Sequence, residues 1–300
     1  MTPQKYTDSI PGICTLMTEI ESTLFVDFAA GTELLYEEKL MKPSASQTWP
    51  LVAPDWLQNG PEWLNDLGYD FYKSFIFDDR YQIYIKGLGN TLLLTFLALL
   101  IGVALGIAIS LIRVSWDKNH REMHGPGKFV LGFFNVLAKI YLTVIRGTPA
   151  VVQLMIMYFV IFASSRNRIM VASLSFGINS GAYVAEIIRG GIMSIDQGQM
   201  EAGRSLGFGY VSTMRYIILP QAFKTVLPTL ANEFIVLLKE TAVAGYVGLT
   251  DITYAGNIIG GTSYDYLFPL LLSALIYLIL VMFFTFLVGR LERRLRTSER

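Results

Sequence analysis

Apolar residues in this chain gather in long uncharged runs instead of alternating with polar ones. No charged residue occurs from Gly87 to Ile112 or from Tyr266 to Gly289. At a rise of about 1.5 Å per residue, a helix of either run is longer than the roughly 30 Å hydrocarbon core of a bilayer. The buried helices of soluble domains need far shorter apolar runs. The pattern therefore predicts an all-α membrane protein.

The same pattern divides the chain into five predicted spans. They cover residues 85–113, 129–164, 169–188, 221–246 and 266–289. Gly147-Thr148-Pro149 breaks the second region, because proline disrupts a helix, so this region also fits an interfacial helix followed by a span. In the third span, Asn179, Ser180 and Gly181 are expected to interrupt the helix and line a cavity.

Composition supports a membrane protein, and the distribution of charge adds a division into two parts. The chain is 53% hydrophobic, with a mean hydropathy of +0.46. Residues 1–82 hold five Lys and Arg against thirteen Asp and Glu, whereas the remainder holds nineteen against eleven. We therefore predict an acidic, extracytoplasmic lead segment (1–82), a transmembrane domain (83–294) and a short cytoplasmic tail (295–300). The lead segment contains Trp and Pro, which fits a partly ordered tail, a helical hairpin or a segment at the membrane interface.

Loop charges predict the orientation of the spans. The three segments that would share one side with the C-terminus carry thirteen Lys and Arg. The opposite flanks carry only Lys86, Arg166 and Arg168. Cytoplasmic loops are enriched in basic residues, so the C-terminus is expected in the cytoplasm and the N-terminus outside.

The predicted cytoplasmic loop between the third and fourth spans (189–220) contains a pattern of its own. Asp196 followed by Gln199 predicts a helix start, because a carboxylate can cap free N–H groups and a Gln three residues on can reach back. Small residues follow, Gly207 supplies a bend, and Pro220 marks the entry to the next span. Composition alone would make the loop a simple connector.

The spacing of this loop resembles the EAA loop of type I ABC importer permeases. Glu201-Ala202-Gly203 is followed after three residues by Gly207 and later by Ile217-Ile-Leu219-Pro220. Glycine stands at 203, where that family usually has a second alanine. The resemblance implies that Glu201, Ala202, Gly203, Leu206 and Gly207 form the contact with an ATPase subunit.

Further motifs extend the resemblance to roughly residues 81–294 and to the polar amino-acid branch, the histidine, glutamine and arginine permeases. They are Gly87-Leu-Gly-Asn-Thr91-Leu, Arg146-Gly-Thr-Pro149 with Val152-Gln153, Tyr183-Val-Ala-Glu186-Ile-Ile-Arg189-Gly190, Leu219-Pro220-Gln221-Ala222 and Leu238-Lys239-Glu240-Thr241. The resemblance implies a bacterial inner-membrane importer with two permease subunits, identical or homologous, two cytoplasmic ABC ATPases and an external solute-binding protein. This chain would then hold no cofactor and be no enzyme, because ATP and Mg would bind the partner subunit. The lead segment lies outside the resemblance.

Charged and polar residues inside the predicted spans are candidates for the substrate pathway, because charges at membrane depth normally face a bundle interior or an aqueous path. The candidates are Arg146, Gln153, Asn179, Glu186 and Lys239. Glu186 can meet an ammonium, and Arg146 or Lys239 a carboxylate. The alternative is that these charges pair with each other, Glu186 with Arg189 or Arg146 with Glu186, without touching a ligand.

Other classes of function receive less support. No G-x-x-x-x-G-K-[ST] motif occurs, and two histidines, His120 and His124, in a basic loop favour a solvated loop over a metal site. The single cysteine excludes an internal disulfide. Neither a secretory signal nor nucleic-acid binding is expected. An ion-gradient-driven secondary transporter and a non-transporting scaffold remain alternatives, and co-purification of an ATPase distinguishes them from an importer.

Overall fold

The computed structural model describes residues 44–120 and 123–297, and every regular element in these residues is helical. The chain divides into two units, Met1–Lys73 and Ser74–Arg300. The division falls earlier than the predicted boundary after residue 82. The two units are described separately below.

The described part of the first unit contains three short helices: α2 (Ala45–Val52), α3 (Asp55–Gln58) and α4 (Glu62–Phe71). Ser44 and Gln47 form a reciprocal capping box at the start of α2. Trp49 packs between the rings of Tyr69 and Tyr72, and its indole N–H donates to Asn65 Oδ1 at 2.8 Å. These contacts give the end of the acidic lead segment a small folded core of its own.

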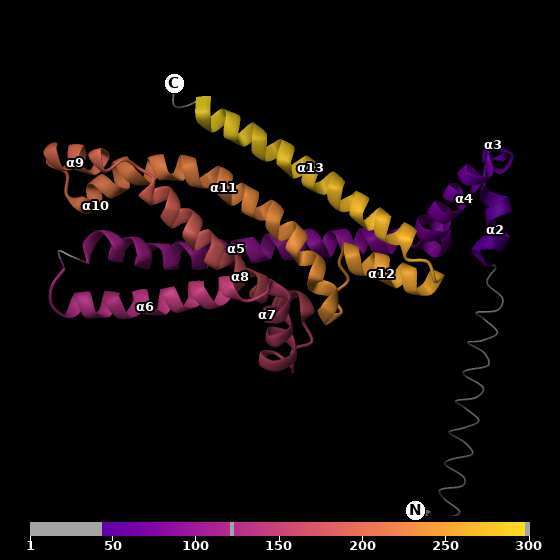
Figure 1. Cartoon of the computed structure of the whole chain (residues 1–300), viewed down its shortest axis with the longest axis horizontal. Helices are drawn as coiled ribbons and strands as arrows, with labels where there is room; N and C mark the ends of the chain where they lie inside the picture. Colours follow the sequence, from indigo (N-terminus) through magenta and orange to yellow (C-terminus); the bar gives the residue numbers. More distant parts are fainter. Residues whose placement is uncertain (1–43, 121–122, 298–300) are drawn as a thin grey trace, which may run out of the picture. The chain divides into compact units, whose positions relative to one another are not determined.

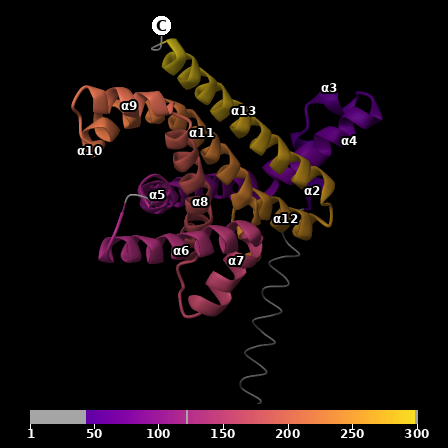
Figure 2. The same ribbon diagram turned by 60° about the vertical axis from the view of Figure 1, so that its left-hand side comes forward.

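The second unit contains all the long helices (Figures 1 and 2). In chain order they are α5 (Tyr81–Asn119), α6 (Pro126–Gly147), α7 (Ala150–Ile156), α8 (Arg168–Met193), α9 (Gln197–Ser205), α10 (Tyr210–Thr213), α11 (Leu219–Glu240), α12 (Ile252–Ser263) and α13 (Leu267–Thr297). Short turns of other helix types precede α5 (η1, Tyr72–Ile76, and η2, Phe77–Asp79) and follow α7 (η3, Met157–Ile161), α10 (η4, Met214–Ile218) and α11 (η5, Thr241–Val247).

Four helices in the described residues, α5, α6, α8 and α13, are long and apolar enough to cross a membrane. The fourth predicted span, 221–246, coincides with α11 and η5, and α11 is less apolar because it carries Lys224, Glu233, Lys239 and Glu240. The second predicted region is divided at Thr148, as expected. The order is a long helix, α6, which is a candidate span, followed by the short apolar α7.

Glycines bring α5 and α8 into close contact along the middle of the bundle. A Cβ at Gly102 would lie 3.0 Å from the Ser180 side chain, and one at Gly106 would lie 2.7 Å from Val184 Cβ. Gly177 on α8 in turn faces the backbone and side chains of α5. The small residues of Gly102-x-x-x-Gly106 therefore allow α5 to pack closely on α8 of the same chain.

The prediction that α8 is interrupted at Asn179–Gly181 is wrong. The helix is continuous from Arg168 to Met193, and all three residues are buried. Asn179 donates to Gln153 Oε1 at 3.0 Å, and Ser180 donates to Glu233 Oε1 at 2.9 Å. Because side chains of neighbouring helices satisfy these polar groups, the backbone of α8 keeps its regular hydrogen bonds.

A buried polar junction attaches α12 to α5 and α13. Asp251 is 0% exposed and caps α12 by accepting from Thr253 N–H at 2.9 Å and Tyr254 N–H at 3.1 Å. Tyr277 O–H on α13 donates to Asp251 Oδ2 at 3.3 Å. On the α5 side, Thr91 Oγ1 accepts from Ile252 N–H at 3.4 Å.

An Asp251→Ala variant is expected to lower stability by about 1–2 kcal/mol, because it removes the carboxylate that accepts from two partly buried N–H groups and from the Tyr277 hydroxyl. An Asp251→Asn variant keeps an acceptor oxygen and should lose less. Thermal unfolding of the purified proteins in one detergent measures the difference. An alanine variant that melts with the wild type would show that the cap contributes little.

Candidate functional site

The loop between α8 and α11 forms a small helical subdomain at one end of the bundle (Figures 1 and 2). α9 begins where predicted, because Asp196 Oδ1 accepts from Gly198 N–H at 2.7 Å. Gln199 does not reach back to the cap, and its side chain accepts from Gln221 at 3.3 Å instead. Gly207 ends the helix with a φ of +85°, which confirms the predicted bend, because glycine adopts this left-handed conformation without strain.

Four of the five residues predicted to contact a partner lie on the exposed side of this loop. They are Glu201, Ala202, Leu206 and Gly207. Leu206 is 77% exposed, and Val211 of α10 is 75% exposed on the same loop. Two large aliphatic side chains are therefore exposed on this small subdomain.

Gly203, the fifth residue, faces the opposite way, so its assignment to the partner surface is wrong. It is buried, and a Cβ there would lie 2.5 Å from Thr213 Cγ2 and 3.1 Å from Ile217 Cδ1. The glycine therefore allows α9 to pack closely on α10 and η4 of its own chain. Sequence spacing alone could not separate the two faces of so short a helix.

We expect Gly203→Ala to destabilise the loop although alanine favours helices by up to about 1 kcal/mol over glycine. The added methyl group meets the buried Thr213, and overpacking of this kind typically costs about 1–3 kcal/mol. Thermal unfolding should show part of the loss recovered in Gly203→Ala/Thr213→Ser. Gly209→Ala, where a Cβ has no neighbour within 4 Å, is the control. Strictly additive effects of the two substitutions would contradict this packing.

An apolar cluster joins the loop to the bundle. Val114 of α5, Ile192 of α8, and Ile218 and Ala222 around the start of α11 form its buried core. Met200 of α9 and Met214 of η4 pack against it. Closely packed side chains therefore connect α9 to three long helices, α5, α8 and α11.

Two of the predicted pathway residues, Arg146 of α6 and Glu186 of α8, line one open cavity of about 460 Å³. Lys139 and Thr143, which the sequence analysis did not single out, also line it. The Arg146 guanidinium lies over the ring of Tyr183, 5.6 Å from its centroid. Lys139 and Thr143 were detectable in sequence only as polar positions seven and three residues before Arg146, on one helical face.

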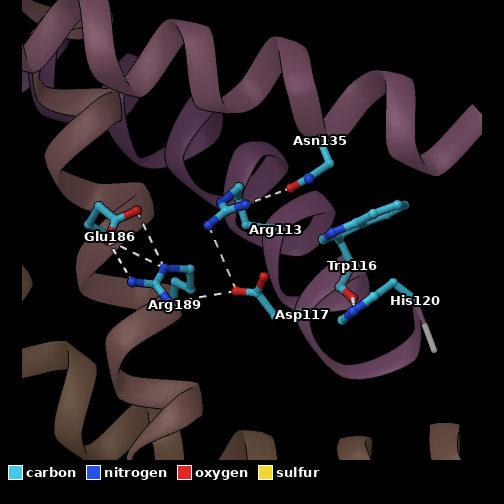
Figure 3. Close-up of polar contacts among 7 residues, drawn as sticks. All are labelled: Arg113, Trp116, Asp117, His120, Asn135, Glu186 and Arg189. Carbon is cyan, nitrogen blue, oxygen red and sulfur yellow. Dashed lines mark hydrogen bonds and ion pairs between the residues drawn. The ribbon is translucent and has the colours of Figure 1, made fainter.

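Glu186 is not a free carboxylate, because it pairs with Arg189 at 2.9 Å (Figure 3). The network continues from Arg189 to Asp117 of α5 at 3.6 Å, and from Asp117 to Arg113 at 3.9 Å. Arg113 also donates to Asn135 Oδ1 of α6 at 2.6 Å. Of the two pairings considered, the one between Glu186 and Arg189 occurs, and it belongs to a network of ion pairs between α5 and α8 that a hydrogen bond to Asn135 extends to α6.

Gln153 and Asn179, the next two predicted residues, lie together but bind each other. Gln153 Nε2 also donates to Ile145 O at 2.8 Å and to Thr148 Oγ1 at 2.7 Å, so its amide spans the break between α6 and α7. Lys239 lies apart from all four. It lines a separate cavity of about 290 Å³ with Thr253, Ser273 and Tyr277. The five predicted residues therefore do not form one site.

Comparisons with known proteins agree with this architecture. Residues 128–297 match the family described as the binding-protein-dependent transport system inner membrane component. The chain is 38% identical over 218 residues to the arginine transport system permease protein ArtQ of Bacillus subtilis (strain 168), covering 72% of this chain and 93% of that protein. It is 35% identical over 218 residues to the glutamine transport system permease protein GlnP of Escherichia coli (strain K12), covering 71% and 92%.

Solved structures show the same fold. The crystal structure of an amino acid ABC transporter with histidines aligns with a TM-score of 0.64 at 38% identity, covering 78% of this chain and 99% of that one. An inward-facing structure of the MetNI methionine ABC transporter aligns with a TM-score of 0.60 at 18% identity, which supports the fold alone. The chain therefore belongs to the family of binding-protein-dependent transport system inner membrane components, and it is a multi-pass permease component of an amino-acid ABC transporter.

Proposed function

We propose that this chain forms the translocation path of an importer for a polar amino acid, and that separate ATPase subunits drive it by docking on the loop around α9. The observation that carries the proposal is the combination of an exposed surface and a packed link. Glu201 and Leu206 face solvent, while Met200 of the same helix packs on the cluster shared by α5, α8 and α11. A partner that grips α9 can thus move the spans.

In this proposal the ATPases bind ATP and Mg, and this chain contributes no catalytic group. A second permease subunit, identical or homologous, completes the path, and a solute-binding protein delivers the substrate on the other side. The α9 end then faces the cytoplasm and the N-terminus lies outside, in agreement with the basic residues counted in the loops on that side.

The substrate class follows from the cavity between α6 and α8 and from the relatives. Arg146 and Lys139 supply cations for a carboxylate, and Thr143 supplies a hydroxyl group in the same cavity. The ion pair with Arg189 leaves Glu186 with less capacity to bind an ammonium than a free carboxylate would have. Relatives whose names specify arginine and glutamine transport support a polar amino acid as cargo.

Uptake by proteoliposomes tests the proposal. Complexes purified through a tag on this chain should contain an ATPase subunit, and labelled amino acid should accumulate only with ATP on the ATPase side and a solute-binding protein on the other. Dissipating all ion gradients should leave uptake intact. Uptake that needs an ion gradient and no ATPase would identify a secondary transporter, and an intact complex without substrate-stimulated ATP hydrolysis would identify a scaffold.

A further inference from the structure

A cation-lined cleft lies at the end of the bundle opposite α9. α8 runs from Arg168 at this cleft to Met193 beside α9, a distance of about 39 Å for a helix of 26 residues. The cleft has a volume of about 530 Å³ and lies between the start of α5, the segment before α8 and the turn after η5. Lys86, Arg166 and Arg168 line it, so it gathers the three basic residues that the loop-charge analysis placed on this side.

Hydrogen bonds hold the walls of the cleft in place. Asn90 of α5 donates to Thr250 O at 2.7 Å, which ties α5 to the turn after η5. Arg168 donates through Nη1 to Gly248 O and through Nε to Tyr158 Oη, each at 3.3 Å. Gly248 has a φ of +70°, which allows the turn to pass close to the Arg168 guanidinium. The cleft is therefore a formed feature of the fold and does not depend on a partner to assemble it.

The positive charge in the cleft is not neutralised from within. In the part of the chain that the structure describes, no carboxylate lies within ion-pair distance of Lys86, Arg166 or Arg168. All three residues are exposed, so their repulsion is reduced by water but not balanced by an acidic neighbour. The cleft therefore presents three cationic hydrogen-bond donors to the carboxylates of a binding partner.

The openness of this site favours a macromolecular partner over a small ion. A free carboxylate bound among exposed side chains keeps most of its water, and exposed ion pairs of this kind contribute little affinity. A protein surface that covers the cleft excludes water from the same pairs, which strengthens them, and its acidic side chains speed association by electrostatic attraction. Leu249 lines the cleft and also belongs to the apolar core shared by α5, α7, α8 and α11, so the packed interior supports one wall of the cleft.

We propose that the cleft between Lys86, Arg166 and Arg168 is the docking site for clustered carboxylates on the surface of the solute-binding protein. This inference rests on the proposed function, because that function supplies a soluble partner at the end of the bundle opposite α9. It adds the chemistry of the contact: acidic side chains of the partner enter a basic cleft of the permease.

Titration of ATP hydrolysis tests this site. The complete complex is placed in nanodiscs, and the probe is the amino-acid-binding protein that stimulates its ATP hydrolysis. Lys86→Glu/Arg166→Glu suits the test, because both side chains are exposed and neither forms an ion pair in the described residues. The half-saturating concentration of the binding protein should rise about tenfold or more, while the maximal rate at saturation stays near that of the wild type. The half-saturating concentration of the binding protein should also depend more steeply on salt concentration for the wild type than for the variant.

Lys128→Glu/Arg290→Glu carries the same change of charge at the other end of the bundle and should leave the half-saturating concentration unchanged. An unchanged value in Lys86→Glu/Arg166→Glu, with stimulation intact, would overturn the docking site alone. A defect that disappears in phosphatidylcholine nanodiscs would assign the cleft to anionic lipid headgroups, and a change in amino-acid affinity without binding protein would assign it to the free substrate. Either result overturns the proposal. A wild-type complex that no binding protein stimulates would contradict the proposed function itself.

Discussion

A Glu201→Lys variant is expected to abolish ATP-driven uptake while leaving the membrane-spanning helices folded. Glu201 is exposed on α9, so lysine fits without disturbing the packing of the loop. The change replaces a negative charge by a positive one at the proposed contact with the ATPase. Like charges placed opposite each other at an interface weaken binding by several kcal/mol. We expect at least a hundredfold loss of uptake and a loss of the ATPase from the purified complex.

The measurement combines uptake in proteoliposomes with the amount of ATPase that co-purifies. Glu292→Lys makes the same change of charge at the end of α13, outside the loop, and serves as the matched control. Size-exclusion profiles and melting temperatures should be the same for both variants and the wild type. Normal uptake by Glu201→Lys would remove this residue from the coupling surface.

A Gly106→Leu variant is expected to prevent stable folding of the bundle. A side chain at this position meets Val184 and the backbone N of Ala185, the latter 3.0 Å from the new Cβ, at the closest approach of α5 and α8. The backbone of α8 cannot rotate away from the new side chain as a neighbouring side chain could. The helices α5 and α8 must therefore move apart, and they lose the packing contacts on either side of Gly106. Overpacking typically costs about 1–3 kcal/mol, and a large residue against backbone lies at or beyond the upper end.

Gly89→Leu is the control for this prediction, because Gly89 belongs to the same helix and a Cβ there has no neighbour within 4 Å. It should yield folded, monodisperse protein with a melting temperature near that of the wild type. Gly106→Ala should show an intermediate loss, partly recovered in Gly106→Ala/Val184→Ala, because shortening Val184 makes room for one methyl group. Equal yields of Gly106→Leu and Gly89→Leu would contradict the packing seen between α5 and α8.

Sequence patterns predicted the features that depend on short stretches of chain. The uncharged runs located α5 and α13, Asp196 marked the start of α9, and Gly207 marked its end. Each of these follows from local chemistry, such as apolar length, an acceptor beside free N–H groups, or a residue that tolerates positive φ. The expected separation of an acidic lead from the membrane domain has the same origin, since it needs only a count of charges.

The partners of buried polar groups depended on the tertiary structure. Asn179 and Ser180 appeared to be helix breakers, yet Gln153 and Glu233 on neighbouring helices satisfy them, and α8 runs through without interruption. Gly203 appeared to belong to a docking face until its contact with Thr213 placed it inside the loop. In these cases the sequence supplied the residue type but not the direction that it faces.

The ion pair at Glu186 and the basic cleft at Lys86 also separate what the sequence determined from what the tertiary structure decided. By itself the sequence determined that this is a membrane protein with a distinct loop between its third and fourth spans, and it supplied three basic residues on the opposite flank. Only the folded chain decided that Glu186 pairs with Arg189, and that Lys86, Arg166 and Arg168 surround one cleft. The physical reason is distance: patterns along the chain act over a few residues, whereas an ion pair or a cleft depends on which segments, far apart in sequence, the packing of α5 against α8 brings together.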